Sequence, residues 1–395
     1  PITVSEKLRQ KNQSDNVGGE AGIIELLDKV PTAANVEFYT QIVLEKSTRR
    51  KLIKTSTNIV KNAYQEDETI ANVLDTAERD ILSVSEGRNK AGFIPIRDVL
   101  HDAYESLEER SKNNGEVTGI ATGYIGLDRM TSGLHADELI ILAARPSVGK
   151  TAFVLNIAKN VAVNLNETVA IFSLEMGAES LVERIICSHA SINAGHLKTG
   201  KLTDEEYTQY FVATGVLAEA PIYIDDTPGI RVSEIRAKCR RLKQERNNLG
   251  LVVIDYLQLI EGNGKESRQQ EVSEISRNLK KLAKELKVPV IALSQLSRGV
   301  EQRQDKRPIM SDIRESGSIE QDADIVAFLY RDDYYRQEPD ENGQVPEVEP
   351  NSTIEVIIEK NRSGPRGTVE LNFMKEFNKF TNLVPDEIEQ RAPMA

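Results

Sequence analysis

The chain contains little cysteine and no long apolar run, and each absence excludes a class of protein. Its 395 residues include two cysteines, Cys187 and Cys239, which are too few and too far apart for a disulfide framework or a zinc site. Both lie in stretches with a helical pattern, so we expect buried free thiols. No apolar run approaches the roughly 18–20 residues that cross a bilayer, so we expect no membrane contact and a cytoplasmic location.

Basic residues are also in deficit. Lysine and arginine number 50 against 62 aspartates and glutamates, which gives a net charge of −12. This balance excludes a protein that coats nucleic acid with a uniformly basic surface, so any such contact requires a local basic patch. Hydrophobic residues make up 39% and charged residues 28%, as in folded globular chains, and the length favours two domains.

Residues 1–90 carry a strong helical pattern. Apolar side chains recur at helical spacing at Ile70, Val73, Leu74, Ala77, Ile81 and Val84. A second pattern covers residues 39–63 and follows Pro31. We predict an all-α N-terminal domain whose two long helices form an antiparallel hairpin. We expect the hairpin to pack on other chains or on a missing segment. The alternative is a self-contained small bundle. The chain starts at Pro1, and we expect that its first helices are missing.

A linker over residues 91–117 contains one short amphipathic helix. Its apolar positions are Ile96, Val99, Leu100, Ala103 and Leu107. The polar stretch 111–115 ends this pattern. A lone amphipathic helix must cover its apolar face, and the pattern leaves open whether its own domain or a neighbouring subunit does so.

From about residue 118, apolar strands alternate with helical patterns. The predicted strands cover residues 139–143, 169–172, 222–224, 251–254, 288–293, 325–330 and 354–358. A clear helical pattern lies between the fourth and fifth strands, over residues 272–286. This alternation predicts an α/β domain with a mostly parallel sheet. We assign it to residues 118–385, followed by a tail over residues 386–395.

A candidate phosphate-binding loop follows the first strand. The sequence ARPSVGKT at residues 144–151 lies between an apolar strand and an apolar helix. Backbone N–H groups of such a loop point at a phosphate, Lys150 can bridge the outer phosphates, and the Thr151 hydroxyl can ligate Mg²⁺. Ala144 occupies the position where the pattern normally has glycine. Alanine adds only a methyl group, so we expect the turn to tolerate it. We predict ATP contacts at Ser147, Gly149, Lys150, Thr151 and Ala152; the alternative is a chance turn.

Polar side chains also follow three other predicted strands. Asp255 ends the strand 251–254, where a carboxylate can hold Mg²⁺ through water. Glu175 follows the strand 169–172 and is either a general base or an acid at a helix N-terminus. Gln295 follows the strand 288–293 and is either a γ-phosphate contact or an ordinary loop residue. Spacing alone does not decide between these roles.

Taken together, these segments resemble the bacterial replicative DNA helicases of the DnaB family. Residues 119–151 resemble the first part of that family's RecA-like ATPase domain, a stretch partly shared with RecA-like recombinases. More specific motifs are VPTAAN at 30–35, FSLEM at 172–176, IDYLQLI at 254–260, LSQLSR at 293–298, DIRESGSIEQDAD at 312–324 and KNRSG at 360–364. The match covers most of the chain.

The resemblance implies roles for several residues. It implies Glu175 as the base, Gln295 as the γ-phosphate sensor and Arg184 as a nucleotide-contacting arginine. It also implies that Lys360, Asn361 and Arg362 contact the ATP bound by the neighbouring subunit. Residues 360–366 hold three cations and no acid at a predicted strand end, which suits a group supplied in trans. Without the family, this stretch would be a plain basic turn.

Three further segments are candidates for contact with DNA. Residues 298–314 hold five cations, three acids and no aromatic residue, so we expect phosphate contacts instead of base stacking. The resemblance implies DNA contacts at Arg314, Glu315 and Gly317. The polar segment 262–268 is a weaker candidate. Residues 231–246 hold seven cations and two acids, yet their spacing is that of a solvated helix face.

The resemblance implies a hexameric ring that uses ATP and Mg²⁺ to move 5′ to 3′ on single-stranded DNA and unwind fork DNA. It further implies primase and a helicase loader as partners, with the N-terminal domain as a collar. Two alternatives remain. One is a RecA-type recombination or remodelling ATPase, which shares the phosphate loop; the other is a ring that binds ATP only as structural support.

Overall fold

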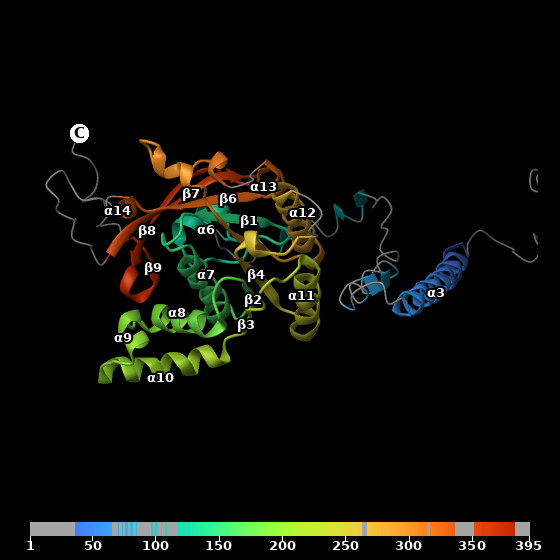
Figure 1. Cartoon of the computed structure of the whole chain (residues 1–395), viewed down its shortest axis with the longest axis horizontal. Coiled ribbons are helices and arrows are strands. Elements are labelled where there is room, and N and C mark those ends of the chain that lie inside the picture. Colours follow the sequence, from blue (N-terminus) through green and yellow to red (C-terminus); the bar gives the residue numbers. More distant parts are fainter. Residues whose placement is uncertain are drawn as a thin grey trace, which may run out of the picture. The chain divides into compact units, whose positions relative to one another are not determined.

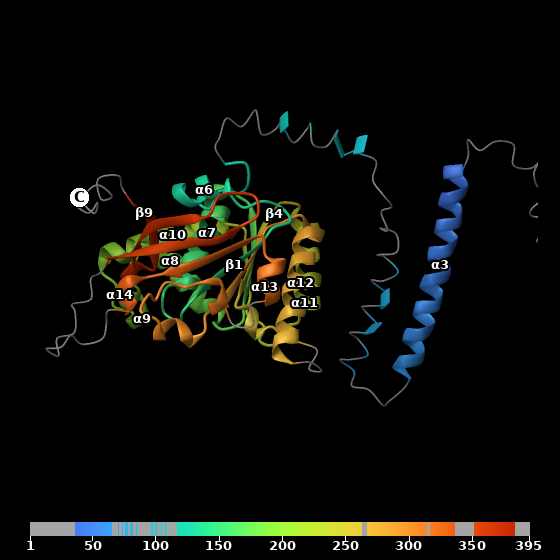
Figure 2. The ribbon, with the colours of Figure 1, turned by 90° about the horizontal axis from the view of Figure 1, so that it is seen from above.

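The computed structural model describes residues 36–64, scattered helical positions between 70 and 108, and residues 117–262, 267–313, 317–335 and 351–383. The chain divides into two compact units, residues 1–108 and 109–395, which are described separately. Figures 1 and 2 show both in two views. Our boundaries at residues 90, 117 and 385 stay predictions, and the tail 386–395 lies outside the described residues.

The first unit contains the long helix α3 (Val36–Ala63), which confirms the helical pattern over residues 39–63. Several of its apolar side chains are exposed, among them Ile53 and Val60. In the second predicted helix, every described position is helical, and Val73 and Val84 are buried. The turn between the two helices lies outside the described residues, so the hairpin stays a prediction.

The second unit is built on a sheet with the strand order β3-β2-β4-β5-β1-β6-β7-β8-β9 in its described part. Six strands are parallel: β1 (Leu139–Ala144), β2 (Thr168–Ser173), β3 (Ile222–Asp225), β4 (Leu249–Asp255), β5 (Val290–Gln295) and β6 (Ile325–Tyr330). Three are antiparallel: β7 (Asn351–Asn361), β8 (Gly367–Met374) and β9 (Lys379–Asn382). The predicted α/β class with a mostly parallel sheet is confirmed.

Helices cover both faces of this sheet (Figure 1). The longer ones are α7 (Lys150–Asn164), α8 (Ala178–Ala190), α10 (Asp204–Glu219), α11 (Val232–Arg246) and α12 (Arg268–Leu286). The shorter ones are α6 (Ile125–Thr131), α9 (Ala194–Thr199), α13 (Gly317–Asp322) and α14 (Asp332–Tyr335). Single 3₁₀ turns are η3 (Leu257–Leu259), η4 (Arg298–Gln302), η5 (Met310–Asp312) and η6 (Lys375–Phe377).

Alternation along the strands divides the core between the two faces. In β1, Ile140 and Leu142 pack in the cluster that includes α7 and α8, whereas Leu139 and Ile141 pack in the cluster that includes α11 and α12. The apolar positions predicted for the helix over 272–286 are all buried in α12. Apolar burial on both faces stabilises the central strands, each as a continuous buried run.

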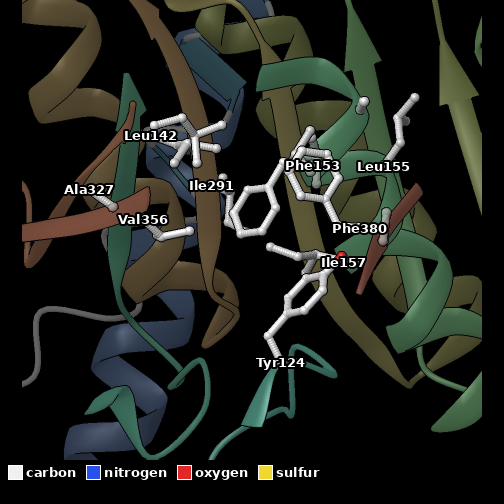
Figure 3. Close-up of a cluster of buried hydrophobic side chains, with 14 of the residues drawn as sticks. Tyr124, Leu142, Phe153, Leu155, Ile157, Ile291, Ala327, Val356 and Phe380 are labelled. Atoms are coloured by element: carbon white, nitrogen blue, oxygen red, sulfur yellow. The ribbon is translucent and has the colours of Figure 1, made fainter. Parts of the chain in front are cut away.

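An aromatic row anchors the antiparallel strands to α7. The rings of Tyr124 and Phe153 stack with centroids 5.3 Å apart, and Phe153 meets Phe380 of β9 edge-on at 5.2 Å (Figure 3). Phe380 in turn stacks on Phe373 of β8 at 4.4 Å. Each ring contributes a large apolar area together with a favourable pair geometry, so the row fixes β8 and β9 over the start of α7.

Both cysteines are buried free thiols, as predicted. Cys187 lies on α8 and Cys239 on α11, and burial raises the pKa of the first to about 11 and of the second to about 12. Protonated thiols of this kind are unreactive packing groups. Among the helices in the described ranges, none has the length and apolar character needed to cross a membrane.

Candidate functional site

The carboxyl ends of β1, β2, β4 and β5 meet at one edge of the sheet, where a pocket of about 410 Å³ opens. Its lining includes most of the predicted nucleotide residues: Ser147, Gly149, Lys150, Thr151, Ala152, Glu175, Arg184 and Gln295. Parallel strands place their following loops at a common edge, which is where such sheets bind ligands. The structure therefore gathers predicted residues that lie up to 148 positions apart, from 147 to 295, around one cavity.

The loop before α7 has the geometry of a phosphate cradle. Gly149 caps the helix with φ 117°, and a Cβ there would lie 3.3 Å from the Phe373 ring. The positive φ favours glycine, and the close ring adds a tight contact for any larger residue. The helix then begins at Lys150 with its N-terminal N–H groups directed to the pocket side, where an anion is favoured.

Lys150 is held among opposite charges. Burial lowers the pKa of its ammonium group, and the carboxylates of Asp255 and Glu175 oppose that shift. The Lys150 Nζ also lies 4.8 Å from the centre of the Tyr256 ring. A lysine in this setting can gain charge stabilisation from a bound phosphate, since the phosphate offsets the loss of water around the ammonium group.

Thr151 and Asp255 form a pair of oxygen ligands. The Thr151 hydroxyl donates to Asp255 Oδ2 at 2.6 Å, and Asp255 is 3% exposed. Its other oxygen, Oδ1, is buried and receives no hydrogen bond from the described residues. A buried carboxylate oxygen without a donor, next to a hydroxyl, fits the hard oxygen donors that Mg²⁺ prefers.

Glu175 and Gln295 extend the pocket on two sides. Glu175 lies after β2 and before α8, which begins at Ala178. The acid in the first turn of α8 is Glu179, so Glu175 does not fill the alternative role of an acid at that helix N-terminus. Gln295 is the last residue of β5 and pairs with Ala144 of β1. Both side chains line the same cavity as the phosphate loop. The arrangement can hold a triphosphate and direct a carboxylate to a water beside it.

Lys360, Asn361 and Arg362 lie at the opposite edge of the sheet. Asn361, at the end of β7, pairs with Ile325, the first residue of β6, and the Asn361 Nδ2 donates to the Met130 carbonyl. Lys360 donates to the Ala323 carbonyl at 2.7 Å, and Arg362 lies 3.5 Å from Asp324. Burial and the neighbouring Arg362 lower the pKa of Lys360. None of the three lines the pocket of its own chain.

The predicted DNA-facing segments are described only in part. Arg314 and Glu315 lie outside the described residues, whereas Gly317 begins α13 with no atom within 4 Å of a Cβ built on it. Two cations of the 298–314 stretch form internal ion pairs: Arg303 with Asp312, and Arg307 with Glu355. These pairs offset part of the local positive charge that the sequence suggested.

The basic helix α11 is also largely neutralised within the chain. Lys238 pairs with Asp225, and both Arg236 and Arg240 pair with Glu285. This pattern agrees with a solvated structural face. In the polar segment 262–268, Arg268 pairs with Glu271 at 2.8 Å, and residues 263–266 are outside the described part of the chain.

Sequence reasoning missed several residues that line the pocket: Arg145, Pro146, Met176, Tyr256, Phe373 and Asn378. Phe373 and Asn378 come from β8 and the turn before β9, two strands that we did not predict. The alternating pattern of Val369, Leu371 and Phe373, all buried, was a signal for β8. No spacing rule connects that strand to a loop more than 200 residues earlier.

A phosphate loop at the carboxyl edge of a mostly parallel sheet, with an oxygen pair and a carboxylate beside it, defines a P-loop nucleotide hydrolase domain. The family model described as DnaB-like helicase C terminal domain matches residues 119–382, and the one described as DnaB-like helicase N terminal domain matches residues 1–45. The chain belongs to the DnaB-like helicase family.

Curated relatives support this assignment over nearly the whole chain. The chain is 59% identical to the replicative DNA helicase DnaB of Geobacillus stearothermophilus and 57% identical to the replicative DNA helicase DnaC of Bacillus subtilis (strain 168). Each alignment spans 97% of this chain and 82% of the relative. A solved structure of a DnaB-like replicative helicase and its interactions with primase matches with a TM-score of 0.76 and 39% identity, over 96% of this chain and 87% of that one.

Proposed function

We propose that this chain is an ATP-dependent replicative DNA helicase that moves 5′ to 3′ on single-stranded DNA as a homohexameric ring. One observation carries the proposal: the pocket lies at one edge of the sheet, and the cations of residues 360–362 lie at the other. A site divided in this way is complete only when a neighbour contributes its cations. The names of the two curated relatives supply the replicative activity.

Within one subunit, the pocket residues bind ATP and prepare it for hydrolysis. Backbone N–H groups of the loop and Lys150 hold the phosphates, while Arg184 on α8 contacts the nucleotide. Thr151 and Asp255 would hold Mg²⁺, which when bound offsets phosphate charge. Glu175 accepts a proton from the attacking water, and Gln295 donates from its side-chain amide to the γ-phosphate.

The neighbouring subunit completes the site in trans. Lys360 and Arg362 are presented at a strand end, each held by carbonyl or carboxylate groups near the start of β6. A cation delivered by a second chain stabilises negative charge on the transferring phosphoryl group and makes hydrolysis depend on assembly. A ring that binds ATP only as structural support would not need a carboxylate beside the phosphate loop. The place of Glu175 in the pocket lining therefore disfavours that alternative.

Exposed apolar faces support assembly into a ring. On α10, Tyr207, Phe211, Val212 and Val216 are exposed, and Phe211 is 70% exposed. In the linker, the described positions Ile96, Leu100 and Leu107 are helical and exposed. Groups of exposed apolar side chains are costly in water and usually mark contact surfaces. We propose that both are buried between subunits, with the linker helix docked on a neighbour.

We place DNA in the centre of the ring, in contact with Arg314, Glu315 and Gly317. Arg314 would bind phosphate, Glu315 would offer its backbone N–H or orient Arg314, and Gly317 would allow close backbone approach. Primase and a loader are the proposed partners, and primase is the partner named for the related helicase of known structure. The curated relatives are bacterial, so the proposed compartment is the cytoplasm.

Fork unwinding tests the proposal. ATP turnover and strand separation are measured on forks that carry only a 5′ or only a 3′ tail. DNA-stimulated turnover and unwinding that requires the 5′ tail are expected. Homologous pairing of strands without unwinding would favour the recombinase alternative, and turnover without either activity would contradict the translocating ring.

A further inference from the structure

We infer that Gln258 is a positioning residue: its side-chain amide holds the end of β5 and thereby sets the direction in which Gln295 enters the nucleotide pocket. This inference rests on the proposed contact between Gln295 and the γ-phosphate. Gln258 itself does not line the pocket. It lies in the 3₁₀ turn η3, three residues after Asp255.

Within the described residues, the end of β5 has no strand partner on the side of β4. β4 and β5 are paired from Val252 and Val290 up to Ile254 and Ala292, and there the pairing stops. β4 ends at Asp255 and the chain leaves the sheet through η3, whereas β5 continues to Gln295. Backbone groups at the end of β5 on this side therefore need another hydrogen-bond partner.

The Gln258 side chain supplies that partner. Its Oε1 accepts the Gln295 backbone N–H at 3.4 Å, and its Nε2 donates to the hydroxyl of Ser294 at 2.8 Å. Ser294 is fully buried, so its hydroxyl would be costly to leave without a partner. The Gln258 Oε1 therefore takes the place of a backbone carbonyl that β4 does not provide, while the Nε2 holds the side chain of the preceding residue, Ser294.

On its other side, this part of β5 is fixed to the strand that leads into the phosphate loop. Leu296 N–H donates to the Ala144 carbonyl at 3.2 Å, and Gln295 pairs with Ala144 in the parallel register. Gln295 is thus held between Gln258 and the loop that binds phosphate. Loss of one support lets the Gln295 amide shift, and a shift of about 1 Å can cost as much as a hundredfold in rate.

Gln258 also contacts α12, whose first residue, Arg268, is the last residue of the polar segment 262–268. Its backbone carbonyl accepts from Arg268 Nη2, at the first residue of α12, and Arg268 pairs with Glu271. One residue therefore joins the start of α12 to the end of β5.

The test uses the full chain and the substitution Gln258→Met, which keeps the length of the side chain and removes both hydrogen bonds. We expect kcat for ATP to fall by about tenfold to a hundredfold with KM little changed. In a Gln295→Ala background, Gln258→Met should cause no further loss, because Gln258 acts through Gln295. Gln258→Glu still accepts from the Gln295 N–H, and it can accept from the Ser294 hydroxyl to which Gln258 donates, so it should recover part of the rate.

Gln244→Met, at an exposed position on α11, is the matched control and should leave both constants unchanged. If Gln258→Met does not fold, Ser294→Ala removes one of the same bonds and should show the same lack of additivity with Gln295→Ala. Additive losses in the double variant, or normal kcat in Gln258→Met beside a low kcat in Gln295→Ala, would overturn the inference alone. Normal kcat in Gln295→Ala would overturn the proposed role of Gln295 itself.

Discussion

The six parallel strands and the three antiparallel strands distribute their functional residues differently. β1, β2, β4 and β5 run in one direction, so the residues that follow them, from Lys150 to Gln295, all reach the same edge. β7 and β8 run in opposite directions, so one end of the pair places Phe373 at the pocket and the other places Arg362 at the far edge. Parallel order concentrates one site, whereas antiparallel order lets a single segment reach both edges of the sheet, as the proposed contact with a neighbouring subunit requires.

Removing the proposed base should have the largest effect on the parallel side. Glu175→Gln keeps the size of the side chain and removes its basicity, so kcat for ATP should fall by about 10²–10⁴-fold while nucleotide binding persists. Single-turnover hydrolysis and nucleotide titration measure the two quantities. Glu179→Gln, an exposed acid in the first turn of α8, is the control and should change little. Unchanged turnover in Glu175→Gln would show that another group activates the water.

Removing Arg362 should lower ATP turnover nearly as much as removing Glu175. Unlike the loss of Glu175, it should be rescued by mixing with a second variant. Arg362→Ala is expected to lower turnover by about 10³-fold, since an arginine supplied in trans contributes at least that much in comparable sites. Mixing Arg362→Ala with Lys150→Ala chains should restore activity, because one variant keeps the pocket and the other keeps the cation. The measurement is ATP turnover against mixing ratio.

Arg366→Ala is the matched control for this experiment. Arg366 lies in the same basic turn, is exposed, and precedes β8. Its loss should leave turnover close to the parent value. Absence of rescue in the mixed rings, at ratios where mixed assembly is verified, would place Arg362 in a purely structural role at the start of β6.

A Phe373 variant tests whether the end of the β7–β8 pair that lines the pocket of its own chain contributes to nucleotide binding. If Phe373 contacts the nucleotide as its place in the pocket lining suggests, Phe373→Leu should raise KM for ATP by up to about tenfold with kcat nearly unchanged, because such a contact is lost equally in the ground and transition states. Phe380→Leu is the control, since Phe380 stacks on Phe373 at 4.4 Å but does not line the pocket. Both variants should melt at lower temperature, and an equal rise in KM for both would contradict a direct contact.

Most pocket residues of the parallel half could be predicted from the sequence because they lie in the segments that follow apolar strands. Arg184, within α8, came only from the family resemblance. Strand, turn and helix are adjacent in sequence at Lys150, and Asp255 ends its own strand, so local pattern and topology lead to the same edge. The antiparallel half could not be predicted to the same depth. Phe373 reaches Gly149 through a sheet register set by β7 and β8 together, which no local pattern encodes.

Gln258 is a second residue whose role could not be predicted from the sequence. Its motif was recognised, yet its role depends on where the pairing of β4 and β5 stops, and this is a property of tertiary structure. Lys360 and Arg362 are the reverse case. Their composition resembled an ordinary basic turn, and the family resemblance implied a role in trans. Their position at the edge opposite the pocket now supports that proposal.

The smallest expected effect concerns Lys159, on α7 and close to Lys379 of β9. Burial and the nearby Lys379 of β9 lower the pKa of Lys159 from 10.5 to about 8. Below pH 8 the lysine is charged in both folded and unfolded chains, so its cost to stability is fully present. Between pH 8 and 10.5 the unfolded chain binds the extra proton, so stability gains from rising pH.

Lys159→Met should therefore stabilise the protein at pH 7 by about 1 kcal/mol, or roughly 2–4 °C in melting temperature. This advantage over the parent chain should shrink as the pH rises from 8 towards 10.5, because the parent lysine becomes neutral in the folded state. Lys379→Met should act in the same direction with a smaller effect, since it removes one of the two causes of the shift. Thermal melts of the three chains at pH 7 and pH 10 measure the difference. An advantage independent of pH would show that the methionine acts by packing between α7 and β9, with no contribution from the charge.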